Sequence, residues 1–125
     1  MAQTQAKLAK YSGSRDVWGG HGIFLANYTG TNPYVNSGTF ATSGEIIDAV
    51  GGLAGLAAAN TPLRTIDFIP SSLSISGTYI IHYAPTAFEP VKRWLAHWYV
   101  IATGAEVANA VDLSAEKAIV LIIGG

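Results

Sequence analysis

The chain has 125 residues, which is enough for one domain with a hydrophobic core. Half of its residues are hydrophobic, which excludes disorder over the whole length, and it has no cysteine, which excludes disulfides and thiolate metal centres. Asp, Glu, Lys and Arg make up only 12% of the residues, against about 25% in ordinary soluble domains. A surface so poor in charge predicts a subunit that neighbouring proteins cover.

The net charge of −1 gives no general attraction to phosphate backbones or anionic lipids, so we expect neither a nucleic-acid partner nor a membrane partner. The longest apolar run, residues 118–123, is far shorter than a membrane-spanning segment. Near the N-terminus, Lys7 and Lys10 interrupt the apolar residues, so we expect no secretion signal.

The first 22 residues show no sustained period of 2 or 3.6 residues and contain three glycines near their end. They predict an extended N-terminal arm, residues 1–22, that precedes a single domain, residues 23–125, and is dispensable for the domain's fold. Large aromatic residues at a chain end usually cover something, so Tyr11, Arg15 and Trp18 are candidate binding residues for a neighbouring protein. A frayed terminus is the alternative.

Residues 23–28 form a short apolar run that is followed by turn-forming residues, which predicts the first strand of the domain. Residues 31–40 alternate turn-forming residues with isolated large ones, and predict a long surface loop.

Two short helices are expected next. Ser43 matches an N-cap, and Glu45 and Asp48 match the acidic residues that stabilise a first helical turn, so we expect a short helix that ends at Gly51. Residues 53–59 are strong helix formers and predict a second one.

The second half of the chain predicts strands. Residues 63–69 alternate in polarity, residues 71–77 predict a loop or weak strand, and residues 78–84 and 93–102 predict an antiparallel hairpin. The apolar run 118–123 predicts a final strand that is covered on both faces. Short strands, frequent turns and little helix together predict an all-β fold, a β-sandwich or a jelly-roll-like body, with one or two short helices.

Candidate catalytic groups are scattered. His82 and His97 would lie opposite each other in a hairpin centred near residues 89 and 90, but no nearby carboxylate supplies a third metal ligand. The serines lack the sequence pattern of a nucleophile elbow, and the helix dipole would explain Glu45 and Asp48. We therefore expect no catalytic residue, no metal site and no cofactor, and hence no enzyme; a small hydrolase that uses His82 or His97 is the alternative.

The aromatic residues of the expected hairpin allow two interpretations. Trp94 and Trp98 fall on one face of a strand, and that face is most simply part of the core. The alternatives are a platform for stacking on sugars, which requires exposed tryptophans, and a subunit interface.

The C-terminal half carries a series of short motifs: Leu63-Arg-Thr-Ile-Asp-Phe-Ile, Gly77-Thr-Tyr, Trp98-Tyr-Val, Gly104-Ala-Glu-Val-Ala-Asn-Ala-Val-Asp-Leu-Ser-Ala and Ile122-Ile-Gly-Gly. This series resembles small structural proteins of tailed-bacteriophage virions, of the head decoration (cement) type. Within it, Asp112 can accept hydrogen bonds from the backbone of Ser114 and Ala115 to close a turn, and Glu106 is expected to be solvated.

The resemblance implies a β-sandwich that binds the outer surface of the assembled head and braces neighbouring capsomers. It implies the major capsid protein and further copies of the same chain as partners, with a homotrimer first and a dimer as the alternative. Tyr11, Arg15 and Trp18 would then contact the capsid or a neighbouring subunit. The expected location is the capsid surface of the virion, after synthesis in the host cytoplasm. A carbohydrate-binding or tail-associated virion module is the alternative function.

Overall fold

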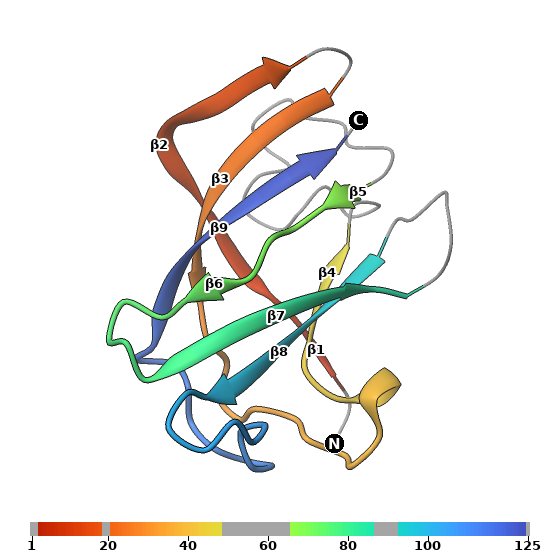
Figure 1. Cartoon of the computed structure of the whole chain (residues 1–125), viewed down its shortest axis with the longest axis vertical. Coiled ribbons are helices and arrows are strands. Elements are labelled where there is room, and N and C mark those ends of the chain that lie inside the picture. Colours follow the sequence, from red (N-terminus) through yellow and green to blue (C-terminus); the bar gives the residue numbers. More distant parts are fainter. Residues whose placement is uncertain (1–2, 19–20, 49–65, 87–92, 125) are drawn as a thin grey trace.

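The computed structural model describes residues 3–18, 21–48, 66–86 and 93–124, with their side chains except those of residues 10–22 and 24 (Figure 1). The described residues form two packed β-sheets and one short 3₁₀ helix, Phe40–Thr42. The fold is all-β and sandwich-like, as the short apolar runs between turn-forming residues predict.

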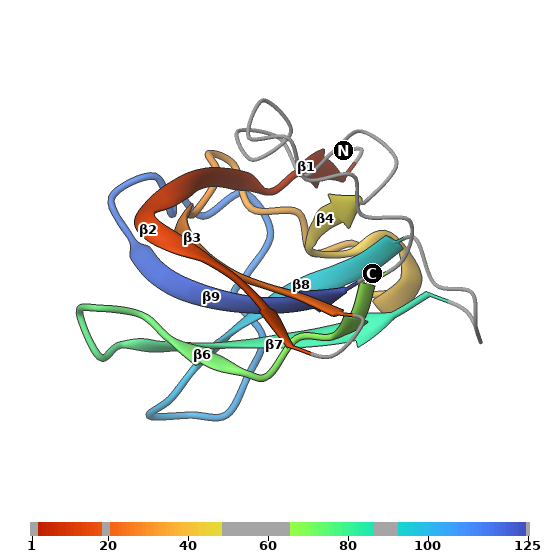
Figure 2. The same ribbon diagram turned by 90° about the horizontal axis from the view of Figure 1, so that it is seen from above.

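One sheet has five strands in the order β1-β4-β8-β7-β6. Its members are β1 (Thr4–Gln5), β4 (Glu45–Asp48), β8 (Arg93–Val100), β7 (Tyr79–Pro85) and β6 (Ser72–Leu73). The other sheet has four strands in the order β2-β3-β9-β5, with β2 (Lys7–Trp18), β3 (His21–Thr29), β9 (Lys117–Gly124) and β5 (Ile66–Phe68). All the neighbouring strands pair antiparallel except β1 and β4, which are parallel. In Figure 2, β2 and β9 lie above β6 and β7, so the two sheets form two layers.

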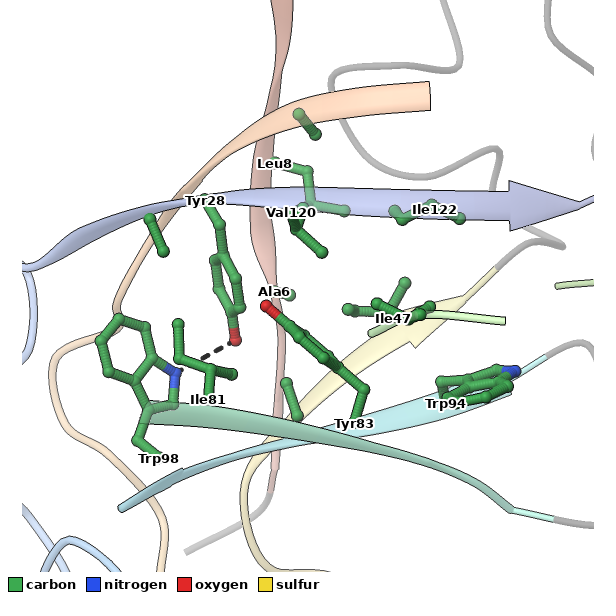
Figure 3. Close-up of a cluster of buried hydrophobic side chains, with 14 of the residues drawn as sticks. Ala6, Leu8, Tyr28, Ile47, Ile81, Tyr83, Trp94, Trp98, Val120 and Ile122 are labelled. Atoms are coloured by element: carbon green, nitrogen blue, oxygen red, sulfur yellow. Dashed lines mark hydrogen bonds between the residues drawn. The ribbon is translucent and has the colours of Figure 1, made fainter. Parts of the chain in front are cut away.

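The core fills the space between the two layers. Alternate residues of each strand point into it, because successive side chains of a strand lie on opposite faces. Figure 3 shows side chains from β3 and β9 meeting those from β4, β7 and β8. The largest buried side chains of the cluster are Trp98, Tyr28, Tyr34, Ile47, Ile66, Ile81, Leu113 and Ile122.

The hairpin and its register confirm the sequence prediction. Strands β7 and β8 pair from Tyr79 with Val100 to Pro85 with Trp94, and His82 lies opposite His97. The strand predicted over residues 23–28 is β3, the weak strand in 71–77 is β6, and the final strand is β9. Of the strand predicted over 63–69, the described part contains β5.

The helix predicted after Ser43 is wrong, because residues 45–48 form strand β4. Glu45 and Ile47 point into the core and are 0% and 1% exposed. Acidic residues after a possible N-cap therefore do not mark a helix start here: the carboxyl group of Glu45 is hydrogen-bonded in the interior. The second helix, predicted over 53–59, lies outside the described residues.

The expected arm is extended, but it is not separate from the domain. Strand β1 pairs with β4, and β2 pairs with β3 along most of its length. Ala6 and Leu8 are buried in the core cluster. Ala6 and Leu8 alternate with Lys7 and Ala9, so one face of this segment is apolar and packs into the core. Deleting the segment would therefore remove one strand from each sheet.

Two further predictions about burial need correction. Strand β9 is not covered on both faces: its residues alternate, and Ile119 is 43% exposed. The segment 31–40 is irregular as predicted, but Thr31, Tyr34 and Val35 within it are buried. Its first half closes one end of the sandwich, whereas residues 37–40 are exposed, as expected for a surface loop.

Gly44 offers a test of how closely the loop before β4 approaches β8. Its φ is +82°, and a Cβ on it would lie 2.4 Å from the carbonyl oxygen of Ala96. Gly77 also has a positive φ, +76°, but nothing lies within 4 Å of its added Cβ. Either alanine substitution costs about 1 to 2 kcal/mol from backbone conformation.

Only Gly44→Ala adds a steric overlap with backbone. We expect it to lower the free energy of unfolding by about 2 kcal/mol more than Gly77→Ala does, as measured by urea denaturation. Equal losses in the two variants would show that the loop does not press against β8.

Candidate functional site

The three residues predicted to bind a neighbour all belong to β2. Arg15 pairs with Phe24 and Trp18 pairs with His21, whereas Tyr11 falls in the irregularity between Lys10 and Arg15. Their side chains lie outside the described part of the structure. The backbone therefore places them on an edge strand of the four-stranded sheet, within the domain.

Trp94 and Trp98 belong to the core, so the sugar platform is wrong. They are 6% and 0% exposed. The Trp98 ring packs edge-on against Tyr28 and Tyr79, with centroid distances of 5.5 Å and 5.9 Å. The Trp94 indole Nε1 donates to the carbonyl oxygen of Ile66 at 3.1 Å, which links β8 to β5 of the other sheet.

The two paired histidines have different surroundings on the outer face of the five-stranded sheet. His97 is buried because Phe40 stacks on its ring at 4.1 Å, and its Nε2 lies 3.0 Å from the Phe40 carbonyl oxygen. His82 is exposed, its Nδ1 lies 2.8 Å from the Ser71 hydroxyl, and its ring packs against Tyr99.

Neither a metal centre nor a catalytic triad follows from this pair. Within the described ranges, no three His, Cys, Asp or Glu side chains gather where they could hold a metal ion. A Ser–His pair needs an orienting acid and an oxyanion hole to attack a carbonyl carbon, and the contacts of His82 with Ser71 and Tyr99 supply neither. The contact between Ser71 and His82 is an ordinary surface hydrogen bond.

A buried polar cluster joins the two sheets. The Glu45 carboxyl oxygen Oε1 accepts hydrogen bonds from the Trp98 indole Nε1, at 2.7 Å, and from the Tyr28 hydroxyl. Trp98 Nε1 also lies 3.3 Å from the Tyr28 hydroxyl oxygen, the contact that Figure 3 shows between β8 and β3. Thr31, whose hydroxyl is also buried, lies against the Glu45 carboxyl and acts to lower its pKa.

Burial dominates the protonation of this cluster. It raises the pKa of Glu45, although hydrogen bonds to the carboxyl group act in the opposite direction. Burial, followed by the nearby Glu45 carboxyl, raises the pKa of Tyr28 well above its usual value. The cluster thus holds a carboxyl group that resists ionisation and a phenol that stays protonated, away from solvent.

A second tyrosine closes the end of the sandwich. The Tyr34 hydroxyl donates to Glu106 Oε2 at 2.7 Å and accepts the backbone N–H of Trp98 at 3.1 Å. Glu106 is therefore a partly buried acceptor and not the solvated group expected. The Asp112 turn forms as predicted for Ser114, whose backbone N–H and hydroxyl donate to Asp112 Oδ1 at 2.8 Å and 2.6 Å.

Among the described residues, a group of exposed apolar side chains forms a candidate binding surface. On the outer face of the five-stranded sheet, Leu73 pairs with Ile80, and Ile80 pairs with Tyr99. Ile75 and Ile101 lie in the turns that follow β6 and β8, and the backbone N–H of Ile101 donates to the carbonyl oxygen of Thr78. We name Leu73, Ile75, Ile80, Tyr99 and Ile101 the 73–101 patch. Ile75, Leu73 and Ile101 are 73%, 62% and 47% exposed.

A second apolar surface lies on the opposite side of the sandwich. It consists of the outward residues of β3, β9 and β5, and we name it the outer β9 face: Ile23, Leu25, Phe68, Ile119, Leu121 and Ile123. Phe68 is 54% exposed. A sheet that faces water on one side usually carries polar residues there, so both apolar surfaces favour contact with other proteins.

Comparison of the chain with protein-family models, with curated proteins and with solved structures gives no match. Within its described residues, the chain has no helix that is long and apolar enough to cross a membrane.

The buried carboxyl group predicts a dependence of stability on pH. Because burial raises the pKa of Glu45 in the folded state, this group favours folding at a pH below its unfolded pKa, and the contribution is lost as the pH rises through the folded-state pKa. Glu45→Gln removes the titration but keeps an acceptor for Trp98 Nε1. We expect the free energy of unfolding, measured by urea denaturation from pH 4 upward, to fall more with pH in the unmodified protein than in Glu45→Gln.

Glu45→Ala is the matched comparison, because it leaves the donors of Tyr28 and Trp98 without their acceptor. We expect it to destabilise the fold by about 3 kcal/mol across the whole pH range. Identical pH profiles for the unmodified protein and Glu45→Gln would show that the carboxyl group does not couple its proton to folding.

Proposed function

We propose that this chain is a bacteriophage decoration (cement) protein, which binds the outer surface of the assembled head and stabilises it by bracing neighbouring capsomers. The observation that carries the proposal is the 73–101 patch. Three of its side chains, Leu73, Ile75 and Ile101, are large, apolar and about half or more exposed in a chain with few charges. Such a surface is suited to permanent contact with a protein shell.

The size of the patch is sufficient for stable binding to a shell that repeats its sites. Complete burial of one exposed leucine or isoleucine side chain contributes about 1.5 to 3 kcal/mol. Three such side chains supply several kcal/mol of gross association energy, from which the entropic cost of docking is subtracted. A shell repeats its sites, so an oligomer that engages two or three of them at once binds far more tightly than one copy does.

Backbone hydrogen bonds hold the two turn residues of the patch, Ile75 and Ile101. The backbone N–H of Ile75 donates to Lys117 O at 2.7 Å, and that of Ile101 donates to Thr78 O at 3.0 Å. The turn between β6 and β7 is closed by Gly77 N–H to Ser74 O at 2.9 Å. Side chains on strands and tight turns lose little backbone freedom on binding, which favours affinity.

The proposed partners are the major capsid protein and further copies of the chain, with a trimer implied by the resemblance and a dimer as the alternative. The proposed location is the capsid surface of the virion. Tyr11, Arg15 and Trp18 would add contacts along the β2 edge. A tail or neck module of the same virion is the second candidate, because an exposed apolar patch fits a neighbouring protein there equally well.

Charged substitutions in the patch test this function. We expect the double variant Ile75→Asp, Ile101→Asp to bind emptied, expanded heads of the phage that encodes the chain at least about a hundredfold more weakly, because docking would bury two carboxylates in an apolar contact. The measurement is co-sedimentation with heads at increasing protein concentration, with saturation at a fixed ratio to the capsid protein for the unmodified chain.

The control is Ala108→Asp, an exposed position in the loop outside the patch. It should retain head binding, and circular dichroism should show that all the variants fold. Binding of the unmodified chain to purified tails and not to heads would favour the tail module. Unchanged head binding by the double variant would remove the patch from the docking surface.

A further inference from the structure

We propose that residues 37–42 form a flap, which neutral His97 latches to the five-stranded sheet and protonated His97 releases. We name these residues the Phe40 flap; they contain the 3₁₀ helix, drawn as the short coil before β4 in Figure 1. The inference concerns the outer face of β8 and does not depend on the capsid function.

The Phe40 flap lies on the surface and is fixed at its two ends. All of its residues are exposed. Before it, the Asn36 side chain donates to Val107 O at 3.0 Å, and after it the Gly44 N–H donates to Val35 O at 2.8 Å. The other hydrogen bonds of the flap join its own residues to one another or to Ser43. The flap can therefore move as a unit between its two fixed ends.

A single side chain of the sheet holds the middle of the flap. Within the described part of the chain, His97 makes both contacts: its ring stacks on Phe40 at 4.1 Å, and its Nε2 lies 3.0 Å from the Phe40 carbonyl oxygen. The Phe40 ring itself stays 54% exposed. The flap thus covers His97 while burying little of its own surface, so few contacts are lost when it opens.

The closed flap fits the neutral form of His97. A carbonyl oxygen only accepts hydrogen bonds, so the Nε2 that faces Phe40 O carries the proton of the neutral ring. The other ring nitrogen, Nδ1, is buried and has no hydrogen-bond partner among the described residues. In the neutral ring this nitrogen holds a lone pair and no proton.

Protonation adds a donor and a positive charge where nothing compensates them. His97 is 1% exposed, so a proton on Nδ1 has no water to bind while the flap is closed. The face of the Phe40 ring attracts a cation, but it does not supply the in-plane acceptor that the new N–H requires. Opening the flap admits water to the ring, so protonated His97 favours the open flap.

The elements that pack on His97 bring no counter-charge among their described residues. The flap carries no titratable side chain. On β7, His82 lies opposite His97 and adds positive charge when it is protonated. On β4, Glu45 points into the core, and burial raises the pKa of its carboxyl group.

Along β8 itself, the outward side chains that titrate are also unable to compensate the charge. Burial raises the pKa of the Tyr99 phenol, which therefore stays neutral in acid. Arg93 is a cation and already pairs with Asp48 at 3.0 Å. A protonated His97 under the closed flap is thus an unpaired buried charge.

Opening changes the surface next to the 73–101 patch. Tyr99, a member of the patch, follows His97 on the same face of β8, and the His82 ring packs against it. Histidines change charge over about pH 5 to 8. As the pH falls through this range, the covered and uncharged surface of β8 becomes open and cationic.

Nuclear magnetic resonance on the whole chain tests the latch. At pH 8 we expect nuclear Overhauser effects between the ring protons of Phe40 and His97, because the two rings are stacked. At pH 5 these signals should weaken at least about tenfold, as the closed flap becomes the minor state. Signals between the core rings of Tyr28 and Trp98 should persist, which separates opening of the flap from unfolding.

Two variants assign the effect to His97. His97→Gln keeps an amide donor for the Phe40 carbonyl oxygen but has no group to protonate, so the backbone amide resonances of the flap should no longer change with pH. His82→Gln, the matched control on the opposite strand, should keep the pH-dependent opening.

Phe40–His97 signals of unchanged strength at pH 5 would overturn the latch, whether or not the His97 ring is protonated there. Flap resonances that still change with pH in His97→Gln would place the trigger on another group. Loss of the opening in His82→Gln would place it on the exposed histidine. The measurement on the unmodified chain depends on neither variant.

Discussion

The sandwich depends on one buried carboxyl group and on the donors that satisfy it. A carboxyl group in an apolar interior is tolerated only where hydrogen bonds replace its lost water. Glu45 on β4 receives those bonds from Trp98 in its own sheet and Tyr28 in the opposite one. These hydrogen bonds connect β4, β8 and β3, so they require the two sheets to align as observed.

Much of the fold could be predicted from local sequence, because strands show alternating polarity or runs of aromatic and β-branched residues. The aromatic and β-branched runs 78–84 and 93–102 identify β7 and β8, and their common centre places His82 opposite His97. Strand β4 could not be predicted in this way. Glu45 after Ser43 fits a helix start as well as a strand, and what decides between them is a pair of donors 17 and 53 residues away. Local patterns do not contain that information.

The candidate surfaces were only partly predictable. Scarcity of charge predicts that a neighbouring protein covers part of the surface, but it does not predict which part, because exposure depends on which face of each strand the pairing turns outward. Ile119 and Val120 are equally apolar in sequence, and only the register with β3 makes the first exposed and the second buried. The same reasoning separates the core tryptophans from a sugar platform: Trp94 and Trp98 lie on the inward face of β8, and Ile66 and Glu45 accept hydrogen bonds from their indole N–H groups.

The short outermost strands limit how another chain could add a strand to either sheet. Strands β1 and β6, which end one sheet, have two residues each, and β5, at one side of the other, has three. The remaining edge, β2, is broken by an irregularity between Lys10 and Arg15. Such edges are poor templates for adding another chain's strand, which is the route to amyloid-like fibrils. The apolar side chains exposed on the outer faces of the sheets can therefore contact another protein without adding a strand to either sheet.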